Sequence, residues 1–164
     1  PNSGRFGPAD FESAVVEAVA DAAPDADLDA LRASFNLIRA ATVLTQQLES
    51  QIHRPAGWTM AGFRVMFCVW VAGELEPRDI ARLSGLSRAA VSSVLNTLER
   101  DGLVERTRES SDRRLVTVRL TDIGADGVIG AYARQNEVEQ DVLSPLKHDE
   151  LGRLADDLQR LIAR

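Results

Sequence analysis

The spacing of apolar side chains predicts a chain built mostly from helices. The segment 59–72 is apolar on all sides, which fits a central, buried helix. Two strands of a β-hairpin are predicted over 104–108 and 115–120, because Val116, Val118 and Leu120 alternate with polar residues. Elsewhere apolar residues recur every three or four positions, the period of an amphipathic helix, over residues 9–23, 28–53, 77–85, 87–100, 121–143 and 147–163.

Residues with known preferences for helix ends mark the boundaries in the middle of the chain. Thr59 and Ser87 suit the N-cap position, and Pro77 suits the first position of a helix. Gly85 and Gly102 suit the left-handed position that follows a last turn. A short helix, a second helix and a hairpin therefore follow one another between residues 77 and 121, which is the order of a winged helix-turn-helix.

The second of these helices, residues 87–100, has two different faces. Its apolar face holds Val91, Val94, Leu95 and Leu98. The opposite face and the helix start are small or polar, so they can approach base edges in a DNA major groove, where an asparagine can pair with adenine. These candidate DNA contacts are Ser87, Arg88, Ala89, Ser92, Ser93, Asn96 and Arg100.

The distribution of charge supports a nucleic-acid partner although the net charge of the chain, −6, at first argues against one. Residues 77–121 contain nine arginines and six acidic residues, a local charge of +3, so the remainder of the chain carries −9. Phosphate binding depends on the local patch more than on the total. Arg106 and Arg108 alternate on one face of the first strand and are further candidates for phosphate contacts.

The helical segments on either side of the winged unit predict dimerisation. Residues 28–53 carry two apolar stripes, which suggest two burial partners, and leucines at 151, 154, 158 and 161 form a coiled-coil-like seam. On a monomer such surfaces would be exposed apolar patches. We therefore expect an N-terminal extension with a short helix (1–27), a helical dimerisation region (28–58 and 121–164) and a DNA-binding domain (59–120).

Three glycines, at 124, 127 and 130, interrupt the predicted helix 121–143. Glycine weakens a helix interior because it has more backbone freedom to lose. Close packing against a neighbouring element is the usual compensation, so we expect this side of the helix to lie against another part of the fold.

The stretch GLSRAAVSSVLNTLERDGLVERTRESSDRRLVTVRLTDIG, residues 85–124, resembles the multiple-antibiotic-resistance regulator (MarR) family. Its most specific signal is Asp112-x-Arg114, followed after five residues by Leu120-Thr121 and then Gly124. In element order the resemblance extends from residue 28 to residue 164. It implies a mainly α (α+β) fold, a winged helix-turn-helix with long N- and C-terminal dimerisation helices.

The resemblance also implies partners and a mode of action. It implies an obligate homodimer whose terminal helices form the interface and whose two wings straddle a pseudo-palindromic operator in double-stranded DNA. It further implies a repressor that is released by a small aromatic acid or phenolic effector. In the family pattern Asp112 orients an arginine at the wing tip, and Arg114 is the match to the motif beside Arg113. A narrow A·T-rich minor groove attracts such an arginine.

An effector pocket has its own candidate residues. Four large apolar side chains lie close together in the sequence, and a basic residue would anchor a carboxylate. For each of them, plain packing in the core is an equally good reading. The candidates are Trp58, Phe63, Met66 and Trp70, with Arg39 or His53 as the polar anchor.

Other kinds of chemistry have little support in the sequence. Cys68 is the only cysteine and lies among apolar neighbours, so no intrachain disulfide is possible, a reducing cytoplasm is expected, and redox sensing is not. His53 and His148 are the only histidines, and neither a metal site nor a cofactor is expected. The longest apolar run, residues 65–72, is too short to span a bilayer.

Two other function classes remain open at this point. A winged-helix module that binds protein and not DNA would show a helix face without basic flanks, and the local charge of +3 argues against it. An enzyme that uses this fold as a platform for dimerisation is not expected, because no Cys–His or Ser–His arrangement is present. The leading prediction is a dimeric, sequence-specific DNA-binding transcriptional regulator.

Overall fold

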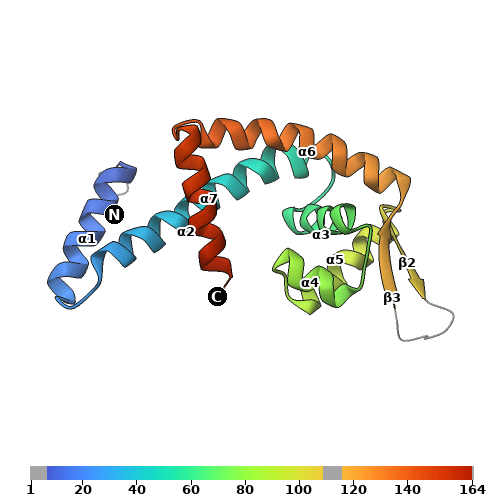
Figure 1. Cartoon of the computed structure of the whole chain (residues 1–164), viewed down its shortest axis with the longest axis horizontal. Helices are drawn as coiled ribbons and strands as arrows, with labels where there is room; N and C mark the ends of the chain where they lie inside the picture. Colours follow the sequence, from blue (N-terminus) through green and yellow to red (C-terminus); the bar gives the residue numbers. More distant parts are fainter. Residues whose placement is uncertain (1–6, 109–115, 164) are drawn as a thin grey trace, which may run out of the picture. The chain divides into compact units, whose positions relative to one another are not determined.

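The computed structural model describes residues 7–108 and 116–163 (Figure 1). The fold is mainly helical with a small antiparallel sheet, as the sequence predicts. None of the described helices is both long and apolar enough to cross a membrane. The elements in chain order are α1 (Pro8–Ala22), α2 (Leu28–Leu48), the π-helical turn η1 (Glu49–His53), α3 (Met60–Ala72), β1 (Glu74–Leu75), α4 (Pro77–Ser84), α5 (Arg88–Arg100), β2 (Val104–Arg108), β3 (Val116–Leu120), α6 (Asp122–Leu143) and α7 (His148–Ile162).

Two features differ from the elements that the hydrophobic pattern predicts. The helix expected over 28–53 is regular only as far as Leu48 and then continues as η1, where the backbone N–H of Arg54 donates to the carbonyl of Glu49 at 2.9 Å. That bond spans five residues and defines a π turn. The strand β1 is the second difference, because two residues are too few to produce a periodic signal.

The chain divides into two compact units, Pro1–Leu44 and Thr45–Arg164. In the first unit α1 pairs with α2. The rings of Phe11 and Phe35 lie 6.1 Å apart between centroids, and the Arg32 side chain donates to the Glu12 carboxylate at 3.1 Å. The predicted N-terminal helix is therefore confirmed and has a packing partner.

The second unit is built around α3, which contacts α4, α5, α6 and β3. Its residues Val65, Met66 and Val69 are fully buried, as expected for a segment that is apolar on all sides. Ile80 of α4 and Leu95 of α5 complete the centre of this core. The core fixes α5 on one side of α3, and this leaves one face of α5 open to solvent.

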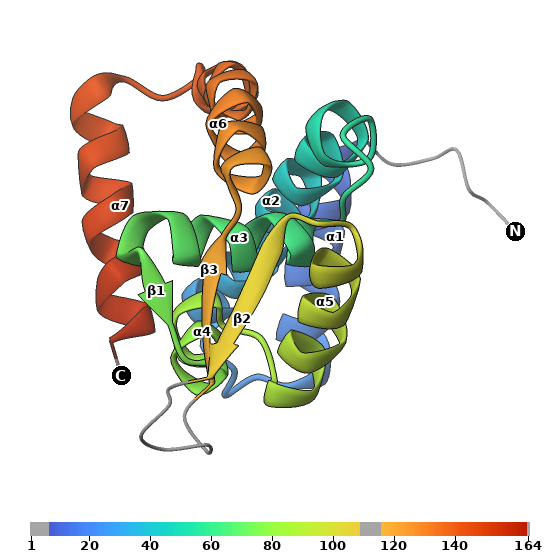
Figure 2. The ribbon, with the colours of Figure 1, turned by 90° about the vertical axis from the view of Figure 1, so that its right-hand side faces the viewer.

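The sheet has the strand order β1-β3-β2, and all its pairs are antiparallel (Figure 2). Glu105 of β2 lies opposite Arg119 of β3, and Glu74 of β1 pairs with the same Arg119 from the other side. The Thr117 hydroxyl donates to the Glu74 carboxylate. The predicted hairpin, β2 and β3, is thus part of a three-stranded wing in which β3 is the central strand.

The ends of α4 and α5 have the chemistry that the sequence predicts. Pro77 begins α4, and Gly85 follows its last residue with φ 68°, a left-handed conformation that favours glycine. The Ser87 hydroxyl accepts from the N–H of Ala90 at 3.1 Å and caps α5. Arg64 of α3 donates to the carbonyl of Ser84 and so satisfies one free carbonyl at the end of α4.

The base of the wing is closed by a set of hydrogen bonds that we call the Thr121 clasp. The Thr121 hydroxyl donates to the carbonyl of Gly102 at 2.8 Å, and the Thr121 N–H donates to the carbonyl of Leu103 at 3.1 Å. The same hydroxyl accepts from the N–H of Gly124 at 3.0 Å and caps α6. The clasp joins the segment that leaves α5 to the segment that enters α6.

The glycines of α6 meet different surroundings. A Cβ on Gly124 would lie 2.0 Å from the carbonyl oxygen of Leu103, and a Cβ on Gly127 would lie 2.9 Å from the Trp58 ring. Among the described residues nothing lies within 4 Å of a Cβ on Gly130. Close packing within the chain therefore explains the first two glycines, and for the third the expectation stays a prediction.

Candidate DNA-binding surface and ligand cavity

The exposed face of α5 is the candidate DNA contact surface. Val91, Leu95 and Leu98 are buried on the opposite face, as the periodicity predicts. We call the exposed set the reading face. It consists of Ala89, Ser92, Ser93, Asn96 and Arg100.

The N-terminus of α5 adds positive character to the reading face. A helix N-terminus carries about half an elementary positive charge, because its first N–H groups have no partner within the helix. Ser87 satisfies one of these groups, and the exposed Arg88 begins the helix. Arg88 forms no ion pair with any residue that the structure describes, so its charge is available to a phosphate.

Other arginines of the winged unit have acidic partners. Arg100 pairs with the adjacent Asp101 at 3.0 Å, and Arg119 pairs with Glu105 across the hairpin at 2.9 Å. These pairs are exposed, and such pairs contribute little to stability. The predicted contacts Asp112, Arg113 and Arg114 lie outside the described residues, and the predicted contact Arg108 is the last residue of β2.

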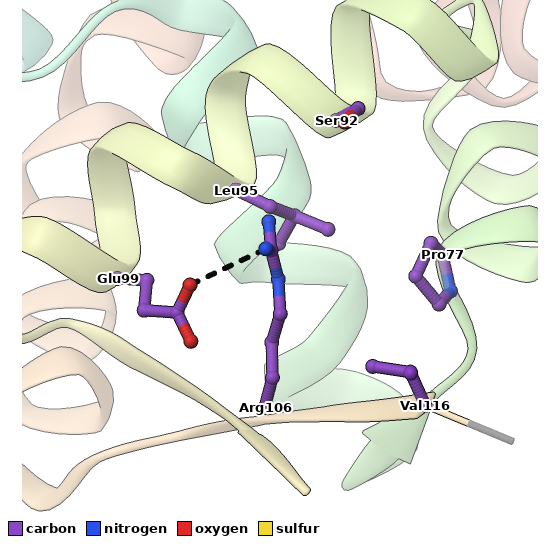
Figure 3. Close-up of a pocket in the computed structure, with 6 residues that line it drawn as sticks. All are labelled: Pro77, Ser92, Leu95, Glu99, Arg106 and Val116. Atoms are coloured by element: carbon purple, nitrogen blue, oxygen red, sulfur yellow. Dashed lines mark ion pairs between the residues drawn. The ribbon is translucent and has the colours of Figure 1, made fainter. Parts of the chain in front are cut away.

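Arg106 is held differently, because it extends from β2 to α5. Its Nη2 donates to Oδ1 of Asn96 at 2.8 Å, and its Nη1 lies 3.3 Å from Oε2 of Glu99. Figure 3 shows the guanidinium between the two elements, beside Leu95. Glu99 was not a candidate from the sequence, because only the packing of the wing against α5 brings it to Arg106.

A groove lies between α5 and the wing (Figure 3). It has a volume of about 470 Å³ and combines apolar walls with the Arg106–Glu99 pair. Its lining is formed by Pro77, Ser92, Leu95, Glu99, Arg106 and Val116.

A second cavity, of about 400 Å³, lies between α3, α4 and α6, and we call it the α3–α6 cavity. Its apolar part includes three aromatic rings. Phe67 lies 5.6 Å from Phe63 and 5.4 Å from Tyr132 between ring centroids. Arg64 and Glu139 also line it. The Glu139 carboxylate accepts from the amides of Gln135 and Asn136. Arg64, in contrast, has no ion-pair partner among the described residues and provides a positive charge. An apolar wall with a cation suits an aromatic ligand that carries a negative charge.

Two buried polar atoms at this cavity have no partner in the described structure. They are the hydroxyl oxygen of Ser84 and Oε1 of Gln135. The other end of the Gln135 amide is satisfied, because Nε2 donates to the Glu139 carboxylate at 2.7 Å. A buried acceptor without a donor costs about 1–3 kcal/mol. A ligand hydroxyl that donates to Gln135 would remove this cost.

The predicted effector residues are brought together only in part. Phe63 lines the α3–α6 cavity, whereas Met66 is fully buried in the core. Trp58 packs against Gly127, and Trp70 is 42% exposed with its ring 5.7 Å from Phe67. Arg39 belongs to the first unit, where its guanidinium lies 5.3 Å from the centre of the Phe35 ring.

His53, the other predicted anchor, is fully buried and stacks on Phe63 at 4.5 Å between ring centroids. Neither ring nitrogen has a hydrogen-bond partner in the described structure. Burial lowers the pKa of His53 below its ordinary value of 6.5, although the charge of Glu49 opposes this shift. His53 is therefore uncharged at neutral pH and is a weak anchor for a carboxylate.

Cys68 also lines the α3–α6 cavity and is half-buried. Burial raises the pKa of its thiol, although the charge of Arg64 acts in the opposite direction. Little reactive thiolate is present at neutral pH. Within residues 7–108 and 116–163, no group of three or more histidine, cysteine, aspartate or glutamate side chains is placed to hold a metal ion.

The comparisons with known proteins agree with this geometry. The sequence profile of the MarR family matches residues 58–116. YwaE of Bacillus subtilis, an HTH-type transcriptional regulator, is 32% identical over 139 residues, which are 80% of this chain and 81% of YwaE. The chain therefore belongs to the MarR family of winged-helix transcriptional regulators.

Two solved structures share the fold. A cysteine-to-serine variant of MarR from E. coli in complex with operator DNA has a TM-score of 0.72 and 22% identity, with 87% of this chain and 96% of that chain covered. NadR in complex with 4-hydroxyphenylacetate has a TM-score of 0.67 and 27% identity, with 77% of this chain and 89% of that chain covered. Both similarities extend well beyond the winged unit.

Proposed function

We propose that the protein is a dimeric transcriptional repressor that binds a pseudo-palindromic operator and is released by a small aromatic effector. The reading face of α5 carries the first part of this proposal. Its small side chains allow close approach to base edges, its N-terminus is positive, and Arg88 is available to a phosphate. Each α5 would enter a major groove, with the wing over the adjacent minor groove.

The proposed dimer is supported by apolar surface that a single chain leaves uncovered. In α7, Leu154 is 37% exposed and Leu161 is 52% exposed, and no residue of this helix is buried. In α2, Ile38 is 67% exposed. We propose residues 28–58 and 121–164 as the dimerisation region, 59–120 as the DNA-binding domain and 1–27 as an N-terminal extension.

The Ala89→Glu variant tests the role of the reading face. Ala89 is exposed in the first turn of α5, where a carboxylate interacts favourably with the helix N-terminus, so the fold should not lose stability. A carboxylate that faces phosphates and base edges costs about 2 kcal/mol or more, so operator affinity should fall at least about thirtyfold. Fluorescence anisotropy with an operator duplex from the protein's own promoter measures this loss.

Ala89→Gln is the matched control, because it adds the same bulk without the charge. It should bind the operator with a smaller loss than Ala89→Glu. The titration should also show one duplex bound for every two chains. If wild type and Ala89→Glu bind the operator with equal affinity, the reading face does not contact DNA. If the wild type does not bind DNA at all, a module that binds only protein is favoured.

For the effector we propose the α3–α6 cavity and the chemistry of a hydroxylated aromatic acid. The ligand ring would contact Phe67 and Tyr132, and its carboxylate would approach Arg64. Its hydroxyl would donate to the unpartnered Oε1 of Gln135. NadR, which shares the fold, was solved with a ligand of this class, 4-hydroxyphenylacetate.

Gln135→Met should distinguish effectors with and without a hydroxyl. We expect wild type to bind 4-hydroxyphenylacetate about tenfold more tightly than phenylacetate, because only the former supplies the missing donor. Gln135→Met should bind both equally. Its stability should change little, because the variant removes a buried unpaired acceptor together with the bond from Nε2 to the Glu139 carboxylate. Tryptophan fluorescence reports binding because Trp70 lies beside Phe67. An unchanged preference for the hydroxylated acid in Gln135→Met would contradict this assignment.

A further inference from the structure

Three side chains connect the reading face of α5 to the wing. Asn96 and Glu99 lie one turn apart on α5, and Arg106 reaches both from the neighbouring strand β2. The Arg106 guanidinium donates to Oδ1 of Asn96 at 2.8 Å and pairs with Glu99 at 3.3 Å. Asn96 is exposed, whereas the Arg106 side chain is only 27% exposed.

The chemistry of the guanidinium fixes the orientation of the Asn96 amide. Arginine has five N–H donors and no acceptor, so the amide atom that it approaches must be the oxygen. The charge-assisted bond to Arg106 occupies one lone pair of Oδ1, the only acceptor of the Asn96 side chain, and fixes the amide with Nδ2 free to donate to DNA. Nδ2 has no partner among the described residues.

Glu99 determines what Arg106 itself can do. Its carboxylate balances the guanidinium charge and holds one of its nitrogens on the α5 side of the wing (Figure 3). A half-buried guanidinium is a weaker phosphate ligand when a carboxylate already balances its charge, as Glu99 does here. Arg106 therefore differs from Arg88, which has no ion-pair partner in the described structure.

The edges of the two purines differ in what they offer to this arrangement. Pairing of asparagine with adenine uses the amide oxygen to accept from N6 and the amide nitrogen to donate to N7. To reach the second lone pair of Oδ1, the adenine amino group would have to lie beside the Arg106 guanidinium, one donor next to another. Guanine offers two acceptors, O6 and N7, and the two N–H groups of Nδ2 can donate to both.

Given that α5 enters the major groove as proposed above, we infer that Arg106 is a positioning residue which makes Asn96 select guanine rather than adenine. Glu99 supports this role by holding Arg106. The sequence alone favours adenine for Asn96, because the sequence does not show that the amide oxygen is already bonded. The specificity of this position is thus set by the wing as well as by α5.

The test begins with randomised operator sites bound to wild type and to Asn96→Ala. One position per half-site should lose its preference in Asn96→Ala, and at that position wild type should prefer guanine to adenine about tenfold. Inosine, which keeps O6 and N7, should bind like guanine, and 7-deazaguanine, which lacks N7, should bind several-fold more weakly. A preference for adenine in the wild type, or no position that responds to Asn96→Ala, would overturn the inference.

Arg106→Met then separates positioning from phosphate contact. Methionine keeps the apolar stem but donates nothing, so Oδ1 is released and the preference should shift from guanine towards adenine. The dependence of affinity on salt should stay that of wild type. An unchanged base preference in Arg106→Met, or a weaker salt dependence, would show that Arg106 does not position Asn96. If the wild type itself does not bind DNA, the proposed function fails. That outcome is distinct from a failure of the inference about Arg106, which requires a wild type that binds DNA.

Discussion

The affinity of the protein for its operator should fall by about a thousandfold or more between roughly 50 and 200 mM salt. Each phosphate that an arginine neutralises releases condensed counterions, so several contacts in a dimer produce a steep dependence. The basis for this expectation is the local charge of +3 over residues 77–121, together with Arg88, which has no ion-pair partner among the described residues. Anisotropy titrations at five or so salt concentrations give the slope of log affinity against log salt.

Arg88→Gln and Arg153→Gln provide the internal comparison. If Arg88 contacts one phosphate in each half-site, its replacement should reduce the slope by about one unit per contact. Arg153 lies on α7, where it pairs with Asp149 at 2.8 Å, and its replacement should leave the slope unchanged. A nearly flat salt dependence in the wild type would contradict the proposal that arginines of the winged unit bind phosphates.

The largest loss of stability from a single methyl group is expected at Gly124. Its added Cβ would lie 2.0 Å from the carbonyl oxygen of Leu103, well inside van der Waals contact. That oxygen cannot yield easily, because it accepts from the N–H of Thr121 at 3.1 Å. We expect Gly124→Ala to lower the free energy of unfolding by about 3 kcal/mol, even though alanine favours a helix by about 1 kcal/mol. Urea denaturation followed by circular dichroism measures the change.

Gly130→Ala is the control in the same helix. Nothing in the described structure lies within 4 Å of its added Cβ, so it should stabilise the protein by about 0.5–1 kcal/mol. If the two glycine-to-alanine substitutions change the free energy of unfolding in opposite directions, the effect of the contact with Leu103 is separated from the effect of helix propensity. Equal effects at the two positions would mean that the backbone of α6 can move away from Leu103.

The ends of the helices in the winged unit could be predicted because each depends on neighbouring residues only. Ser87 caps α5 through the N–H of Ala90, and Gly85 adopts φ 68° after α4. The faces of α5 were equally predictable, since a helix with a fixed period has fixed sides. These are local properties, and the structure confirms them.

Contacts between elements could not be predicted in the same way. The bond from Arg106 to Asn96 depends on how the wing packs against α5, and β1 exists only because Glu74 pairs with Arg119 of a distant strand. The effector candidates were chosen as large apolar side chains close together in the sequence, so they included Met66, which is fully buried. Which side chains meet depends on how segments distant in the sequence pack together. A single sequence contains little information about that packing.

One signal for the cavity was nevertheless present in the sequence. The buried stripe of α6 contains Gly124, Val128 and Ala131, and the next position in this stripe is Gln135. A polar residue on a buried stripe needs a partner, and the Oε1 of Gln135 has none in the described structure. Such a residue supports the proposed effector site more directly than a group of large apolar residues does.

The Thr121 clasp has a mechanical consequence. It ties the residues that follow α5, Gly102 and Leu103, to the first turn of α6 through short backbone and hydroxyl bonds. Tyr132 and Gln135, farther along the same α6, line the cavity proposed for the effector. Because a helix resists bending, a ligand that tilts α6 at the cavity, as proposed above, would also displace the residues at the end of α5. The proposed effector site and the reading face would then be coupled through one helix and the hydrogen bonds of the Thr121 clasp.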